Sequence, residues 1–520
     1  MVNRSKLWRR LRRTVAAVEP SGETYTLVRR GYLQGLGVIF LFAFLSLLVH
    51  LDPLFGESGL LPARRYIPLL KDAYDGHPFW SRPTLFLFHV SDPVMAGLAW
   101  TGLALSAALA AGCANAVLVA ALWVIYLSFV NIGQIFYGYG WESILLEATF
   151  LAIFLCPLTR FRLSKAPLPP PLAVIWFIRW LIFRVMFGAG LIKLRGDACW
   201  RDLTCLIYHY ETQPIPNPLS WYLHQAPPWF HKLGTLSNHI VEVIIPLFLF
   251  GPRRFRIVAG ILFILFQVML ILSGNLSWLN WLTIVIAVPC FDDRALRACI
   301  PMRFRRERAE DHPPVVSNTI WKIHRGVIGA LAVLLLVLSV NPIRNMLSPH
   351  QVMNRSFDPF YIMGTYGAFG SIGRERYEVI LEGTRDRRLT PDTVWEAYEF
   401  PAKPGRLDRR PAIVAPFHYR LDWQIWFAAM QDYRHNPWLV HLVYKLLQGD
   451  DTPNRLLAHN PFPDAPPAYI RIEHYRYRFT KPDDTSKNWW TRERIGTYLP
   501  PLSLDDPSLR EFLEQHRLLE

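Results

Sequence analysis

The sequence lacks the motifs of the common soluble enzyme classes. It has no G-x-x-x-x-G-K-[ST] phosphate loop, no G-x-S-x-G nucleophile elbow and no H-E-x-x-H metal motif. Zinc-finger spacing and RNP-type motifs are missing too, so nucleic acid is not an expected partner despite the net charge of +15. We therefore predict no metal site and no cofactor.

A cleavable signal peptide is also missing. Residues 1–30 are basic and polar, and the apolar run that follows is too long for the core of a signal peptide. We expect this run to act as a signal anchor, with the N-terminus in the cytoplasm.

Cysteine is scarce, with six residues in a chain of 520. Four of the six lie in or beside apolar runs, whereas Cys199 and Cys205 share one polar segment. Their C-x5-C spacing is neither a redox nor a zinc signature. An oxidising compartment would permit a disulfide between them, and two free thiols are the alternative.

Long apolar runs dominate the chain up to about residue 341. A membrane span needs about 20 predominantly apolar residues. About nine segments qualify: 31–51, 85–110, 115–137, 141–158, 172–194, 234–251, 255–273, 276–290 and 325–341. The shortest two, 141–158 and 276–290, are the weakest candidates.

Basic clusters support this arrangement, because cytoplasmic loops of membrane proteins carry an excess of Lys and Arg. With the N-terminus inside, the clusters at 160–162, 253–256 and 303–306 all fall in cytoplasmic loops. We predict a basic cytoplasmic arm at 1–30, a transmembrane helical domain at 31–341 with a long extracytoplasmic loop at 195–233, and an extracytoplasmic domain at 342–520. In the long loop, Trp221 and Trp229 are expected to form part of an interfacial aromatic belt.

The C-terminal domain has the pattern of an α+β fold. Residues 376–382, 393–400 and 469–480 alternate as strands do. Residues 421–431 and 437–447 are predicted helices, the first with an apolar face formed by Trp423, Trp426, Phe427 and Met430. The glycine-rich segment 364–373 lacks dinucleotide-binding spacing and is expected to form a loop.

Ionisable residues inside the predicted spans are costly and often functional. Arg179, Arg184 and Lys193 share one span, and Glu142 and Glu147 lie in the preceding one. We expect carboxylate–guanidinium pairs between these two helices. We also expect His239 and Glu242 to hydrogen-bond to each other. Lys193 either extends to the interface or, if desolvated, acts as a base.

Several long motifs resemble the lipase maturation factor family. They include FGAGLIKLRGDACWRDLTCLIYHYETQPIPNPLSWY at 187–222, LSNHIVEVIIPLFLF at 236–250, FHYRLDWQIWFAAM at 417–430 and WWTRERIGTYLPPLSL at 489–504. The resemblance covers about residues 130–505 and suggests a bacterial-type member. It implies a multipass membrane protein, of the endoplasmic reticulum in animals or the inner membrane in a bacterium, that helps secreted clients such as lipases to fold.

The resemblance makes a non-enzymatic folding factor the leading hypothesis. Candidate client-binding residues are Trp200, His209, Tyr210, Trp221, Arg420, Trp423, Trp426 and Trp489. A shorter motif, GAGLIKL at 188–194, is similar to the vitamin K-dependent γ-carboxylase family. That similarity implies an alternative, a membrane enzyme with Lys193 as base on a quinone-like cofactor. A transporter is a third hypothesis, suggested only by the intramembrane charges.

Overall fold

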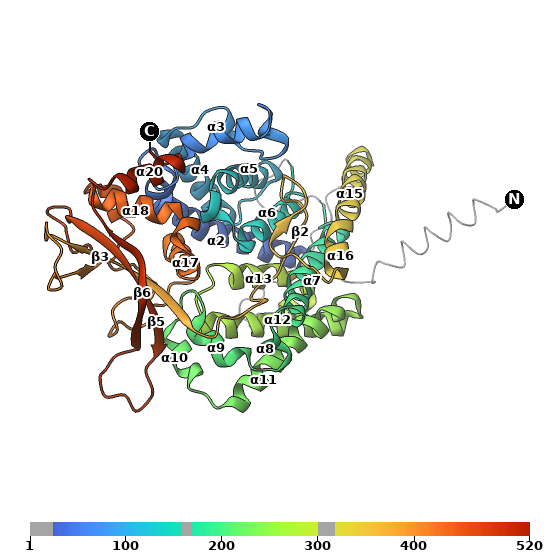
Figure 1. Ribbon diagram of the computed structural model, residues 1–520. Helices are drawn as coiled ribbons and strands as arrows, with labels where there is room; N and C mark the ends of the chain where they lie inside the picture. Colours follow the sequence, from blue (N-terminus) through green and yellow to red (C-terminus); the bar gives the residue numbers. More distant parts are fainter. Residues whose placement is uncertain (1–23, 159–167, 300–317, 520) are drawn as a thin grey trace.

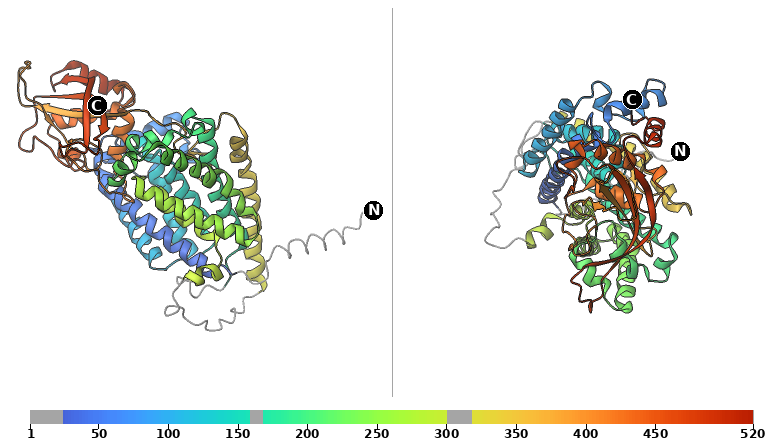
Figure 2. Two further views of the ribbon diagram at one scale, coloured as in Figure 1. Left: turned by 90° about the horizontal axis from the view of Figure 1, so that it is seen from below. Right: turned by 60° about the vertical axis from the view of Figure 1, so that its left-hand side comes forward.

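The computed structural model describes residues 24–158, 168–299 and 318–519. Most of the predicted basic arm and two basic clusters, 160–162 and 303–306, lie outside these ranges. The described chain forms a bundle of helices with a strand-containing C-terminal domain at one end of it (Figures 1 and 2).

Apolar helices build the bundle. Six segments are long and apolar enough to cross a membrane: Thr26–Phe55, Asp92–Ala110, Leu172–Arg195, Pro228–Phe250, Arg253–Ser273 and Trp321–Leu347. These contain α2 (Thr26–His50), α4 (Asp92–Ala110), α7 (Leu172–Arg195), α11 (Pro228–His239), α12 (Arg253–Ser273), α15 (Asn318–Leu338) and α16 (Val340–Leu347). The chain is therefore a polytopic membrane protein by length and composition of its helices.

Three further apolar helices are shorter. They are α5 (Ala116–Ile132), α6 (Gly140–Ile153) and α13 (Leu279–Ala287). Between the bundle helices lie the short helices α3 (Ala63–Ala73), α8 (Ala198–Arg201), α9 (Cys205–Thr212), α10 (Pro218–His224) and α14 (Asp293–Cys299). The last turns of the Pro228–Phe250 segment are irregular, with a π-helical stretch at Ile240–Ile244 and a 3-10 stretch at Ile245–Phe250.

The C-terminal domain contains a four-stranded antiparallel sheet in the order β4-β3-β5-β6. Its strands are β3 (Arg376–Thr384), β4 (Glu396–Ala397), β5 (Tyr469–Phe479) and β6 (Trp490–Leu502). A separate two-stranded sheet pairs β1 (Arg355–Ser356) with β2 (Gly364–Thr365). The helices are α17 (Arg420–Ala428), α18 (Pro437–Leu447), α19 (Asp451–Asn454) and α20 (Pro507–Gln515). Helix α17 packs against β3, and α18 packs against β5 and α20.

The predicted elements of this domain agree with the structure except at the sheet edges. The strand predicted at 393–400 is only two residues long, because β4 pairs with β3 solely at Glu396–Ala397. Strand β6 was not predicted at all. It is an edge strand that carries Arg492, Glu493, Arg494 and two prolines, and such residues are typical of protected edges but hide the alternation of a strand.

Buried ion pairs tie the bundle together. Arg184 of α7 pairs with Glu147 of α6, as predicted, and Tyr366 also donates a 2.6 Å hydrogen bond to that carboxylate. The other predicted interhelical pair is wrong. Glu142 instead pairs with Arg420 of the C-terminal domain at 2.9 Å, and Arg179 donates to the carbonyl of Pro289 at 2.8 Å. A buried guanidinium takes whichever carboxylate or carbonyl the packing supplies, and sequence proximity does not decide which.

Candidate functional site

Helix α7 ends in a glycine-containing sequence that lets other segments approach closely. A Cβ on Gly190 would lie 2.6 Å from a methyl of Val243 and 3.0 Å from the Cβ of Glu242. A Cβ on Gly188 would lie 2.5 Å from the carbonyl oxygen of Tyr366. The distances of 2.6 and 2.5 Å are shorter than a Cβ atom tolerates. Gly190 therefore allows the close approach that sets Lys193 beside Glu242, and Gly188 allows the approach of the Tyr366 backbone.

Lys193 forms a buried ion pair. Its Nζ donates to both carboxylate oxygens of Glu242 at 2.7 Å and to Oδ1 of Asn238 at 3.1 Å. The Trp200 ring centroid lies 5.0 Å from the same ammonium group. Lys193 is 5% exposed, so the expectation that it extends to the interface is wrong. Its Nζ is engaged by one carboxylate and one amide oxygen, and the role of Lys193 as a base stays a prediction.

The expected hydrogen bond between His239 and Glu242 is also wrong. Glu242 accepts from Lys193 and from Asn238 Nδ2 at 2.9 Å, while His239 Nε2 contacts the carbonyl oxygen of Trp200 at 2.9 Å. Asn238 and Glu242 are four residues apart on one helical face, and that spacing could have indicated that these two side chains hydrogen-bond to each other.

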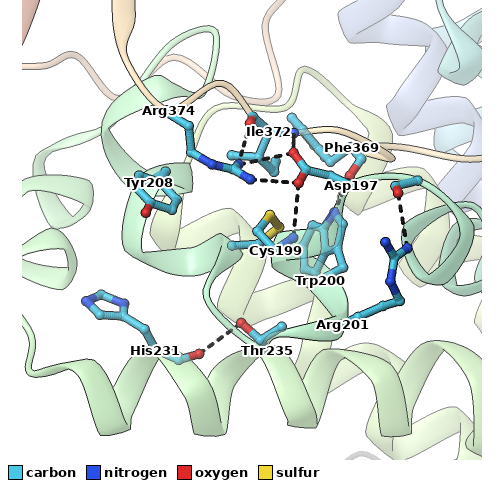
Figure 3. Close-up of a disulfide and its surroundings, with 12 residues drawn as sticks. Asp197, Cys199, Trp200, Arg201, Tyr208, His231, Thr235, Phe369, Ile372 and Arg374 are labelled. Carbon is cyan, nitrogen blue, oxygen red and sulfur yellow. Dashed lines mark hydrogen bonds and ion pairs between the residues drawn. A yellow bond between two sulfur atoms is a disulfide. The ribbon is translucent and has the colours of Figure 1, made fainter.

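The segment after α7 is attached to the glycine-rich loop 364–373. Cys199 and Cys205 are joined by a disulfide (Figure 3). Beside it, Asp197 accepts hydrogen bonds from both terminal nitrogens of Arg374, at 2.7 and 3.1 Å, and this ion pair lowers the pKa of Asp197. Trp200 Nε1 donates to the carbonyl of Phe369 at 2.8 Å. The disulfide closes the segment after α7 on itself, whereas the ion pair and the Trp200 hydrogen bond attach this segment to the glycine-rich loop.

His209 lies on α9 and is 8% exposed. Its Nδ1 has no hydrogen-bond partner among the described residues. Burial, with a smaller contribution from the nearby Lys193 ammonium, lowers the pKa of His209 to about 4. The imidazole is therefore neutral near pH 7.

A cavity of about 490 Å³ lies between the bundle and the C-terminal domain, and we call it the interdomain cavity. The polar groups on its walls include Lys193, Asn238, Glu242, Glu375, His209, Gln213, Gln267, Asn280 and Thr283. Most of the remaining wall is apolar or aromatic. It includes Met186, Ala189, Trp200, Tyr210, Phe266, Tyr366, Phe369, Trp423, Trp426, Phe427 and Met430. Its volume is within the range of about 300–1,000 Å³ that is usual for small-molecule sites.

The structure brings five of the predicted client-binding residues to this cavity. Trp200, His209 and Tyr210 reach it from the loop after α7, and Trp423 and Trp426 reach it from α17. Trp423 and Trp200 are buried, so neither forms an exposed contact surface.

The other three candidates lie elsewhere. Arg420 is fully buried, donates to Glu142 and to the carbonyl of Phe136, and stacks on the Tyr137 ring 3.6 Å away. Trp221 donates to Thr480 Oγ1 at 3.2 Å and packs edge-on against Trp489. Trp221 therefore contacts the C-terminal domain instead of forming a bilayer-level belt, whereas Trp229 is 66% exposed.

Across the parts of the chain that the structure describes, no group of three or more His, Cys, Asp or Glu residues is arranged to hold a metal ion. Gln267, which lines the cavity, was not singled out from the sequence. Its Oε1 accepts from Asn280 at 2.7 Å, and its Nε2 donates to the sulfur of Met186, 3.8 Å away.

Comparison with known proteins gives long matches. The model of the lipase maturation factor transmembrane domain matches residues 27–298, and that of the lipase maturation factor C-terminal domain matches residues 362–500. Lipase maturation factor 1 of Bos taurus is 48% identical over 93% of this chain and 90% of its own length. The Homo sapiens protein of the same name is 47% identical over 93% and 89%. Lipase maturation factor 2 of Homo sapiens is 30% identical over 95% and 85%. No solved structure matches the chain.

Proposed function

We propose, because this chain belongs to the lipase maturation factor family, that it is a membrane-bound factor for the folding and maturation of secreted lipases. The observation that carries the proposal is the extent of the identity. The 48% identity spans 93% of the chain, so both the helical bundle and the C-terminal domain of the relative are represented here.

We place client contact at the outer rim of the interdomain cavity. Met353 and Met430 line the cavity and are 43% and 48% exposed, and the half-buried Trp426 lines it as well. Methionine and tryptophan suit such a surface, because flexible thioethers and large aromatic rings adapt to varied apolar partners. The buried candidates Trp200 and Trp423 would then support this rim from below.

We further propose nine spans, with the N-terminus inside and the C-terminal domain outside. The support comes from four segments that follow α2, α5, α7 and α12 and contact the C-terminal domain. The contacting pairs are Leu60–His441, Phe136–Arg420, Asp197–Arg374 and Asn275–Ala412. Four ends on one side require three return passes between them, and α4, α6 and the Pro228–Phe250 segment supply those passes. Helix α13 is a fourth return pass, which follows α12. The last span, α15, then leads out to the C-terminal domain.

The membrane is the endoplasmic reticulum if the source is eukaryotic and the inner membrane if it is bacterial. Glycosylation acceptor sites or accessible cysteines introduced into the loops 56–60 and 291–293 would test the orientation. Modification of the first loop and protection of the second is the expected pattern, and the reverse pattern would refute it.

The functional test is co-expression with a secreted lipase. We expect the chain to raise secreted lipase activity per unit of lipase antigen. Met430→Asp should reduce this effect, because it places a charge on the proposed client surface. Ile413→Asp is the matched control, since Ile413 is 77% exposed in the same domain but does not line the cavity. Equal lipase activity with and without the chain would contradict the function, and equal effects of the two variants would contradict the rim.

A further inference from the structure

The walls of the interdomain cavity connect two different surfaces. Met269, on the wall, is 47% exposed near the outer end of α12, where a transmembrane helix faces lipid. Met430, also on the wall, is 48% exposed on the C-terminal domain. A molecule in the cavity would therefore be in reach of the bilayer at one side and of water at the other.

Charge on the walls is balanced. The Lys193 ammonium is matched by the Glu242 carboxylate at 2.7 Å, and the Glu375 carboxylate is matched by Arg476 at 2.6 Å. His209 is neutral near pH 7 because burial lowers its pKa to about 4. An additional charged group placed there would be buried without a counter-ion, which is costly. The chemistry of the cavity therefore disfavours a carboxylate or ammonium head group.

Two polar side chains on the cavity walls can form further hydrogen bonds. Among the described residues, the Nδ1 atom of His209 has no hydrogen-bond partner, and the Nε2 of Gln267 donates to a sulfur 3.8 Å away. Buried polar atoms are almost always hydrogen-bonded, so an unpartnered one on a side chain that lines a cavity points to a ligand or a water molecule. Polar side chains inside a membrane span that face a cavity commonly contact ligands.

We propose that the interdomain cavity binds an uncharged amphiphile with a single hydrocarbon chain, taken from the bilayer. The hydroxyl or carbonyl head group hydrogen-bonds to His209, and the chain lies along the apolar wall formed by Phe266, Met269 and Leu270. A partner that is itself a protein segment would fit less well, because a polypeptide brings backbone polar groups that this largely apolar wall does not satisfy. The inference goes beyond client maturation and is tested without any client.

The test uses the full chain in lipid nanodiscs and a photoactivatable monoacylglycerol that carries a diazirine on its acyl chain. Labelled peptides are mapped by mass spectrometry. We expect labelling of cavity residues, and we expect unlabelled monoacylglycerol to compete with it. The fatty acid of the same chain length should compete about tenfold less effectively. Competition by both at the same concentration would overturn the proposed neutral head group. Labelling confined to lipid-facing side chains outside the cavity would overturn the site.

Two variants act from different helices. Ala189→Leu fills the cavity from α7 and should abolish the labelling of cavity residues, whereas Ala189→Ser keeps the space and should not.

His209→Leu removes the hydrogen-bonding atom and should weaken binding about threefold to tenfold, the range expected of one hydrogen bond. His224→Leu is its control, since His224 Nδ1 is also buried without a partner but does not line the cavity. Unchanged labelling in both test variants, each confirmed as folded by its elution profile, would refute the proposal. If either variant fails to fold, the competition between monoacylglycerol and fatty acid for labelling of the wild-type protein tests the proposal.

Discussion

Replacing Lys193 by methionine would show what the buried ion pair does. The variant leaves the Glu242 carboxylate buried with only the Asn238 amide, 2.9 Å away, as a hydrogen-bond donor. Both side chains of the pair are 6% exposed, so water compensates little for the loss. Removing one partner of a buried ion pair typically costs about 3–5 kcal/mol of stability, because the remaining charge is left uncompensated.

The double variant Lys193→Met/Glu242→Met distinguishes the effect of removing the whole ion pair from the effect of removing one of its residues. Replacing a whole buried pair by apolar side chains of similar volume is often neutral, so the double variant should regain most of the lost stability. The free energy of unfolding is measured by SDS titration of the purified protein in mixed micelles, followed by circular dichroism. A double-mutant cycle then gives the coupling energy between the two residues, which we expect to be about 2–3 kcal/mol.

Two results would refute this reasoning. A loss of less than about 1 kcal/mol for Lys193→Met would mean that the pair does not hold α7 against the neighbouring helix. A double variant no more stable than the single one would mean that the two residues are not coupled. Lipase maturation by the double variant adds a second measurement. It should be retained if Lys193 only joins helices, and lost if its amine takes part in chemistry.

Three further perturbations have expected outcomes. Arg420→Ala should destabilise the protein by about 3–5 kcal/mol, because it leaves Glu142 buried without its ion-pair partner, and protease accessibility of the C-terminal domain would report it. Gly190→Val should prevent folding because its Cβ alone would lie 2.6 Å from the next helix, whereas Gly97→Val, with open space around it, should fold normally in a size-exclusion assay. His209 has a folded pKa of about 4 and an ordinary value of 6.5, so its contribution to stability is present above pH 6.5 and is lost as the pH falls toward 4. The slope of the free energy of unfolding against pH in that window should be about 1.4 kcal/mol per pH unit smaller in His209→Phe than in the wild-type protein. Other buried histidines, such as His441, keep part of the slope in the variant.

The helices of the bundle could be predicted from the sequence because each is defined by its own composition. Residues 172–194 and 255–273 are apolar over the length of a span, and the structure has α7 and α12 at nearly the same bounds. In the C-terminal domain, α18 begins and ends where predicted, since Pro437 begins it and its apolar periodicity covers the remaining length. Strand β6 was not predicted, because its charged residues and prolines hide the alternating pattern of a strand.

The partners of the buried charges could not be predicted in the same way. Glu142 and Arg420 are 278 residues apart, and Lys193 and Glu242 are 49 apart. Nothing local to either residue selects its partner. The choice follows from where the glycines of α7 and the docking of the C-terminal domain bring the helices.

Local composition and periodicity, read along the chain, thus determined the membrane character, most of the helices and strands, and the long motifs that resemble its family. Only the tertiary structure decided that Lys193 is paired and buried, and that a nitrogen of His209 has no hydrogen-bond partner among the described residues. It also decided that residues from nine separate α-helices and the glycine-rich loop line one cavity. The physical reason is that hydrophobicity and backbone preference act over a few residues, whereas ion pairs and cavities are properties of surfaces that only meet once the helices pack.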